Sequence, residues 1–128
     1  MDAKTIEDAR HGYGLTGERI TSMDEARAVA RRITDATGER HIATDAGSHT
    51  SPRYAVIDAP KIGTAVSMGF NGDYYPCGQI ARISESLRRV VTTDGTVFYR
   101  RCESATWVRK GGTFCLVAGT RNERNPSF

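Results

Sequence analysis

The chain has 128 residues, a length that fits one domain with a hydrophobic core large enough to need no disulfide or metal. It holds 18 Lys and Arg against 15 Asp and Glu, a net charge of +3 at pH 7. No apolar run reaches the roughly 20 residues of a membrane-spanning helix, and the acidic segment 1–8 lacks the apolar core of a secretory signal. We therefore expect neither a membrane helix nor a cleaved leader, and a cytoplasmic location.

The charge is unevenly distributed along the chain. Residues 1–58 hold eight basic and ten acidic side chains, a net of −2, whereas residues 59–128 hold ten basic and five acidic ones, a net of +5. A basic half that also carries the strand signals suggests nucleic acid or another polyanion as partner. The three cysteines, Cys77, Cys102 and Cys115, show no C-x-x-C spacing, so we expect reduced thiols, with a zinc site as the less favoured alternative. We predict no metal and no cofactor.

Residues 1–20 are expected to form an irregular arm, with one or two helical turns over residues 5–10. The segment Gly12–Gly17 is a literal G-x-G-x-x-G, the pattern that binds pyrophosphate between a strand and a helix. Here the preceding residues are polar, and the next helix begins several residues later. We therefore interpret this segment as a flexible glycine-rich loop in preference to a dinucleotide site.

The spacing predicts an amphipathic helix over residues 23–37. Ser22 is a good N-cap, Glu25 completes a capping box, and Gly38 is a natural stop. Apolar residues recur at helical spacing and form one stripe, which we expect to face a sheet, with partner binding as the alternative: Met23, Ala26, Val29, Ala30 and Ile33.

Strand patterns follow over residues 40–44, 53–57, 64–70 and 77–84, with a turn at Asn71-Gly72-Asp73 and an edge or strand-start position for Pro76. The loop over residues 45–52 contains Asp45, Ser48 and His49, the side-chain types of a catalytic triad. A triad is assembled in space by oriented geometry, so this proximity in sequence is weak evidence for catalysis.

The segment over residues 86–101 is a predicted hairpin centred on Asp94-Gly95, a dipeptide that favours a two-residue type I′ turn. That turn would place Val91 opposite Phe98, and it would pair Arg89 with Arg100 and Arg88 with Arg101. Like charges directly opposite each other repel, so these two pairs indicate either an anion site or four solvated side chains.

A second hairpin is predicted around Gly111-Gly112, with Trp107 opposite Leu116 and Arg109 opposite Phe114. The tail over residues 118–128 is polar until its end. We expect either a loose tail or a tail in which Phe128 docks back on the fold.

The order of segments after residue 60 resembles SH3-like small barrels of the Tudor and KOW type. The segments are Pro60-Lys61-Ile62-Gly63-Thr64-Ala65-Val66-Ser67, an aromatic turn, Gly78-Gln79-Ile80-Ala81-Arg82-Ile83 and a short hairpin. The resemblance covers residues 60–117 and implies a binding module. Segments 71–76, 98–101 and 125–128 are similar to small proteins of tailed phages, which implies an accessory, counter-defence or virion role, in the host cytoplasm.

We therefore predict an α+β fold in which one amphipathic helix packs on an SH3-like barrel or a bent antiparallel sheet. Residues 21–128 would form a single domain, with its β-rich part over 53–117. The predicted function is non-enzymatic binding of nucleic acid, including single strands, through basic and aromatic side chains: Arg82, Arg88, Arg89, Arg100, Arg101, Arg109, Lys110, Tyr74 and Tyr75. The alternatives are an accessory protein that binds an acidic host protein and a domain that binds a small phosphorylated ligand.

Overall fold

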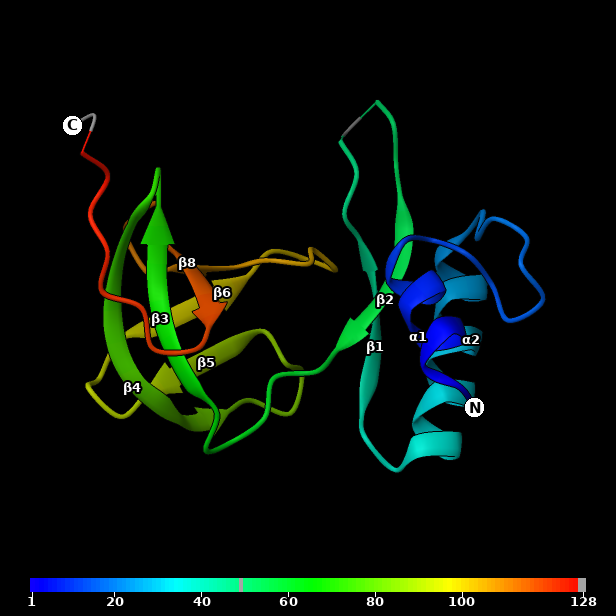
Figure 1. Cartoon of the computed structure of the whole chain (residues 1–128), viewed down its shortest axis with the longest axis horizontal. Helices are drawn as coiled ribbons and strands as arrows, with labels where there is room; N and C mark the ends of the chain where they lie inside the picture. The colour runs from blue at the N-terminus through cyan, green and yellow to red at the C-terminus, as the bar shows by residue number, and fades with distance from the viewer. Residues whose placement is uncertain (49, 127–128) are drawn as a thin grey trace. The chain divides into compact units, whose positions relative to one another are not determined.

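A computed structural model describes residues 1–48 and 50–126 of the chain. The chain divides into two compact units, of which the first holds Met1–Ala59 with Glu103–Ala105 and the second holds Pro60–Cys102 and the residues from Thr106 onward. Figure 1 traces both along the chain. The division describes how the chain is packed and not whether the two units unfold together. The single domain predicted over residues 21–128 therefore stays a prediction.

The first unit contains two helices and a two-stranded sheet. Helix α1 spans Ala3–Arg10 and α2 spans Met23–Thr37, followed by the antiparallel strands β1 (His41–Asp45) and β2 (Tyr54–Asp58). Helix α1 is capped by Asp2, whose Oδ1 accepts the Thr5 amide at 2.8 Å. The helical turns expected over residues 5–10 are therefore present, and the helix begins two residues earlier, at Ala3, where the Asp2 cap sets its start; Ala9 is buried.

Helix α2 has the predicted bounds. The Ser22 hydroxyl accepts the Glu25 amide at 3.1 Å, the Glu25 carboxylate accepts the Thr21 amide at 2.8 Å, and Gly38 ends the helix at a φ of +75°. The stripe buries Ile33 and two alanines within the first unit. The predicted α+β class is confirmed, and α2 packs on the two-stranded sheet of β1 and β2, as Figure 1 shows. The core of this layer is a cluster of buried residues: Ala9, Ala30, Ile33 and Val56.

The second unit is a closed antiparallel barrel of six strands, consistent with an SH3-like small barrel. The strands pair in chain order, and β8 pairs with β3 to close the barrel. Their bounds are β3 Ala65–Phe70, β4 Asp73–Ile83, β5 Arg89–Thr92, β6 Val97–Arg100, β7 Trp107–Arg109 and β8 Cys115–Ala118. Phe98, Val90 and Cys77 are buried in the barrel, and the buried Trp107 indole donates to the Leu87 carbonyl at 2.8 Å. No helix among the described residues is long and apolar enough to cross a membrane.

The two-residue turn expected at Asp94-Gly95 is wrong. Val91 pairs with Val97, and Thr92 and Thr96 close a three-residue loop through a 3.0 Å bond from the Thr92 amide to the Thr96 carbonyl. Only Gly95, at a φ of +88°, takes a left-handed conformation in this loop. The Asp94 carboxylate instead accepts from the Thr96 amide at 3.1 Å, which stabilises the longer loop with its glycine bulge.

This loop shifts the β5–β6 register by one residue from the prediction. Arg89 is opposite Tyr99, so Arg89 does not pair with Arg100, and the Arg88 carbonyl accepts the Arg100 amide at 2.7 Å. A one-residue slip moves every side chain of one strand to the other face of the sheet. The two predicted Arg pairs are therefore absent from the barrel.

The hairpins at Asn71-Gly72 and at Gly111-Gly112 form as their turn residues predict. Asn71 and Gly72 form a two-residue connection between β3 and β4 with φ of +51° and +85°, as a type I′ turn requires. Between β7 and β8, Val108 pairs with Cys115 and the Arg109 amide donates to Phe114 at 2.7 Å, which confirms the predicted register.

Candidate functional site

Basic side chains are concentrated in the barrel unit. By the sequence of each unit, the barrel unit carries ten Lys and Arg against four Asp and Glu, a net of +6. The helical unit, which includes Glu103, carries eight against eleven, a net of −3. The asymmetry between the units is therefore larger than the asymmetry between the two halves of the sequence, and it directs attention to the barrel surface.

One face of the β4–β5–β6 sheet brings two arginines and a tyrosine together. Arg89 lies directly opposite Tyr99, and Arg82 lies opposite Val91, two residues along the strand from Arg89. Residues opposite each other in an antiparallel pair, and residues two apart on a strand, share one face of the sheet. Arg82, Arg89 and Tyr99 therefore form one surface, which we call the basic barrel face.

The basic barrel face is the outer face of the sheet. The neighbours of its residues on the strands, Val90 and Phe98, are both 0% exposed and form the barrel core. In contrast, Tyr99 is 41% exposed, and Arg82 and Arg89 are exposed. The side chains of these two arginines form no ion pair or hydrogen bond with another described residue. Their guanidinium groups are therefore available to an anion from solution, beside a ring that offers a stacking surface.

The other predicted basic residues lie at the two ends of the β5–β6 hairpin. Arg88 immediately precedes β5 and Arg101 immediately follows β6, so both lie next to the basic barrel face, and both are exposed. Arg109 and the exposed Lys110 lie at the opposite end, where the Lys110 amide donates to the Val97 carbonyl at 2.8 Å. Arg88 and Arg101 can extend the basic barrel face, whereas the second pair forms a separate patch.

Arg100 is part of the barrel interior. Its residue is 8% exposed, and its guanidinium lies 5.2 Å from the centre of the Trp107 ring. Strand alternation explains this position, because Arg100 lies two residues from the buried Phe98 on β6 and so shares its face. The predicted role of Arg100 in binding an anion from solution conflicts with this burial.

Tyr74 and Tyr75 are each stacked with an arginine of the C-terminal segment. The Arg121 guanidinium lies 3.6 Å from the centre of the Tyr74 ring. The ring also lies close to Gly69, its partner on β3, where an added Cβ would meet the Tyr74 Cε1 atom at 2.6 Å. Tyr75 is covered in a similar way, by the Arg124 guanidinium at 3.7 Å and by the edge of Phe114. In this conformation each of the two rings has an arginine stacked on it within the barrel unit, which competes with a base for the same ring.

Residues 119–126 form a C-terminal strap that explains these stacks. The buried Ser67 hydroxyl donates to the Gly119 carbonyl and accepts the Arg121 amide, both at 2.8 Å. The Tyr74 amide donates to the Glu123 carbonyl at 2.8 Å. The strap is therefore ordered on the barrel by polar contacts, and Phe128, which was expected to dock back, lies outside the described residues.

The polar loop after β1 shows turn contacts at Asp45. The Asp45 Oδ1 atom accepts the amides of Gly47 and Arg53, both at 2.9 Å, while His49 lies outside the described residues. His41 lies elsewhere in the same unit, with Nε2 at 3.0 Å from Asp58. Within residues 1–48 and 50–126, no three His, Cys, Asp or Glu side chains are grouped so that they could hold a metal ion. The three cysteines are free thiols.

Two groups of the barrel have shifted pKa values. Burial raises the pKa of the Cys77 thiol, and the nearby Asp94 charge adds to the effect. Burial also acts to raise the pKa of Asp94, but hydrogen bonds from Thr92 and Thr96 and the charge of Arg109 outweigh it, so the pKa of this carboxyl lies below its ordinary value. Asp94 therefore stays ionised at neutral pH and stabilises the β5–β6 loop.

The sequence analysis named Arg82 and Arg89 of the basic barrel face, and it named Tyr74 and Tyr75, but not Tyr99, as stacking surfaces. The alternation of β6 around a buried Phe98 indicates that Tyr99 faces outward, but its position opposite Arg89 depends on the loop length. Comparison with protein-family models, with curated proteins and with solved structures finds no significant match for this chain. The case for function therefore rests on the chain's own residues.

Proposed function

We propose that this protein is a non-enzymatic module that binds nucleic acid through the basic barrel face. The observation that carries the proposal is the β5–β6 register, which sets an exposed Tyr99 directly opposite Arg89, with Arg82 on the adjoining strand. Exposed aromatic rings among unpaired cations suit single strands, because a base of any sequence can stack while phosphates contact the guanidinium groups.

The charge of the barrel unit supports the same proposal. A net charge of +6 raises the local concentration of a polyanion and speeds its association. With two to four phosphates neutralised by Arg82, Arg89 and the flanking arginines, log K for a single strand should fall against log[salt] with a slope of about −1.4 to −2.8. Such a slope is weaker than that of large DNA-binding proteins, which fits a module with modest affinity.

We also propose that residues 60–117 form a barrel of the Tudor or KOW type. Its support is the closed six-stranded barrel, which spans Ala65–Ala118 and so falls within nearly the same residues. The similarity to small tailed-phage proteins suggests an accessory role in a host cell and rests on the sequence segments alone. An acidic host protein is the alternative partner for the same basic surface.

The proposal is tested by fluorescence anisotropy with a labelled single-stranded oligonucleotide at low and moderate salt. The double variant Arg82→Gln/Arg89→Gln should lose about tenfold or more in affinity and show a slope reduced by about 1.4. The matched control is Arg40→Gln/Arg53→Gln, which removes two exposed arginines from the helical unit and should bind as the wild type does. Absence of binding at low salt, or equal losses in the two double variants, would overturn the proposal.

A further inference from the structure

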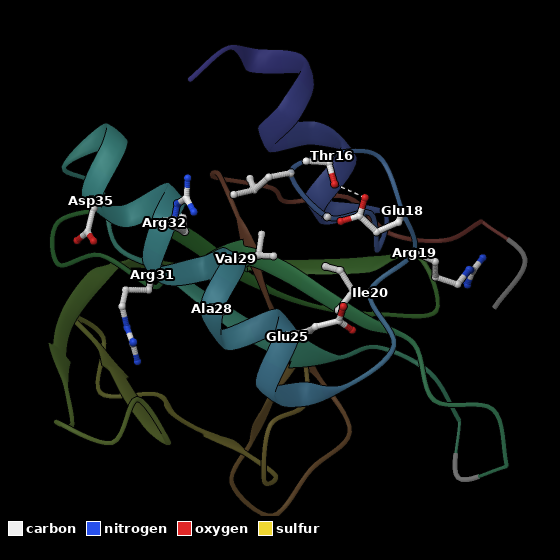
Figure 2. Close-up of a pocket in the computed structure, with 12 residues that line it drawn as sticks. Thr16, Glu18, Arg19, Ile20, Glu25, Ala28, Val29, Arg31, Arg32 and Asp35 are labelled. Carbon is white, nitrogen blue, oxygen red and sulfur yellow. Dashed lines mark hydrogen bonds between the residues drawn. The ribbon is translucent and has the colours of Figure 1, made fainter.

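The helical unit contains a pocket of about 360 Å³ between the Gly12–Gly17 segment and helix α2. Figure 2 shows the loop on one side of the space and the helix on the other. This volume lies at the lower end of the range for small-molecule sites. The pocket belongs entirely to the helical unit, so it is separate from the basic barrel face.

The floor of the pocket is apolar and rests on the core of the unit. Ile20 is 4% exposed, and Leu15 and Val29 are partly buried against the core cluster of this layer. The side chains of Ile20 and Val29 both point into the space, as Figure 2 shows. Ala28, which is exposed on α2, adds a small wall. A ligand with an apolar body can therefore release water from this floor.

The glycine segment is not a phosphate cradle. The amides of Gly12, Gly14 and Gly17 all donate to backbone carbonyls, at 3.2, 2.6 and 3.1 Å, and Ser22 caps the N-terminus of α2. The amides that a pyrophosphate would need are thus taken. The role of the glycines here is to let the loop turn back on itself over α2.

The charged side chains of the rim differ in whether they have partners. Glu18 accepts from the Thr16 hydroxyl, and Glu25 accepts from the amide and hydroxyl of Thr21, at 2.8 and 2.7 Å. Arg19 lies over the Tyr13 ring, 5.8 Å from its centre. The remaining rim charges, in the C-terminal half of α2, form no ion pair or hydrogen bond with another described residue: Arg31, Arg32 and Asp35.

We propose that this pocket binds a small organic anion with an apolar body, such as a carboxylate or a sulfonate on an aromatic or aliphatic frame. The apolar body lies over Ile20 and Val29, and the anionic group contacts the unpartnered guanidinium group of Arg32, whereas Figure 2 shows the Arg31 side chain directed away from this space. The lining as a whole is balanced in charge, with three arginines and three carboxylates, so the anionic group is placed by the charge-assisted contact that the unpartnered Arg32 guanidinium offers and not by a net positive field.

The test uses 8-anilinonaphthalene-1-sulfonate, an aromatic sulfonate, in a fluorescence titration of the full chain, with decanoate as a competitor. We expect saturable binding that decanoate displaces. The variant Arg32→Gln should raise the Kd about tenfold or more, since a charge-assisted contact is lost. Ala28→Phe should block the site from the apolar side. The matched control Arg40→Gln/Arg53→Gln should bind with the wild-type Kd.

A second readout locates the probe on the molecule. Amide chemical shifts should move for residues of the Gly12–Gly17 segment and of α2, and should stay unchanged for β5 and β6. Absence of binding, an unchanged Kd in both pocket variants, or shifts confined to the barrel would each overturn the proposal. Because the oligonucleotide titration uses the other unit, failure of this site leaves the proposed nucleic-acid binding untouched, and the converse also holds.

Discussion

Replacing Gly78 with alanine should destabilise the barrel by about 2–5 kcal/mol. Gly78 lies in β4 at a φ of +85°, a conformation that costs a residue with a Cβ about 1–2 kcal/mol. The added Cβ would also lie 2.1 Å from the Thr93 Oγ1 atom, so the threonine must rotate away. That rotation breaks the 3.0 Å hydrogen bond from the Gln79 amide to Thr93, a loss of about 0.5–1.5 kcal/mol, and rotamer strain adds a similar amount.

The assay is guanidinium unfolding followed by the fluorescence of Trp107, the single tryptophan, which is buried in the barrel. Gly111→Ala is the matched control, because Gly111 also has a positive φ, of +73°, but an added Cβ there meets nothing within 4 Å. The control should lose only the backbone strain, about 1–2 kcal/mol. Equal losses in the two variants would refute the close approach of Thr93 to Gly78.

Three further variants test single contacts. Ser67→Ala removes a fully buried hydroxyl that holds Gly119 and Arg121 of the strap, and should cost about 1–3 kcal/mol in the same unfolding assay; an unchanged midpoint would argue that the strap is not held there. The pKa of Asp94 is lower in the folded state than its ordinary value of 3.8. The ionised carboxylate therefore stabilises the fold at pH values above 3.8, and this stabilisation is lost as the pH falls through the folded-state pKa. Asp94→Asn should therefore be less stable than the wild type at pH 7, with the gap closing below about pH 4, whereas a gap independent of pH would contradict the assignment. Ser22→Ala should lower the stability of α2 by about 1 kcal/mol, seen as an earlier loss of far-UV circular dichroism, and full retention would rule out the cap.

The sequence predicts helix ends and turns correctly where the backbone preference of one or two residues determines them. Helix α2 begins and ends at its capping residues, and Asn71-Gly72 forms the two-residue turn that its positive φ values allow. The loop length of the Asp94-Gly95 hairpin could not be predicted from the dipeptide. An aspartate can either adopt a left-handed conformation or accept a hydrogen bond from the backbone amide two residues later. Here the bond to Thr96 stabilises a three-residue loop.

That single loop decided most of the errors at the candidate site. Arg100 shares the inward face of Phe98 by strand alternation and lies against Trp107, and the extra loop residue sets the exposed Tyr99 opposite Arg89 in place of Arg100. The stacks on Tyr74 and Tyr75 had a different origin. They depend on a strap about 50 residues away in sequence, whose polar composition gives no periodic signal of where it binds.

The basic barrel face is tested most directly by an amide chemical-shift titration of the full chain with a short single-stranded oligonucleotide. We expect the largest shifts on Arg82, Arg89 and Tyr99, with smaller shifts on the flanking Arg88 and Arg101. Shifts centred on Tyr74, Tyr75 and the C-terminal strap, shifts confined to the helical unit, or no shifts at low salt would contradict it.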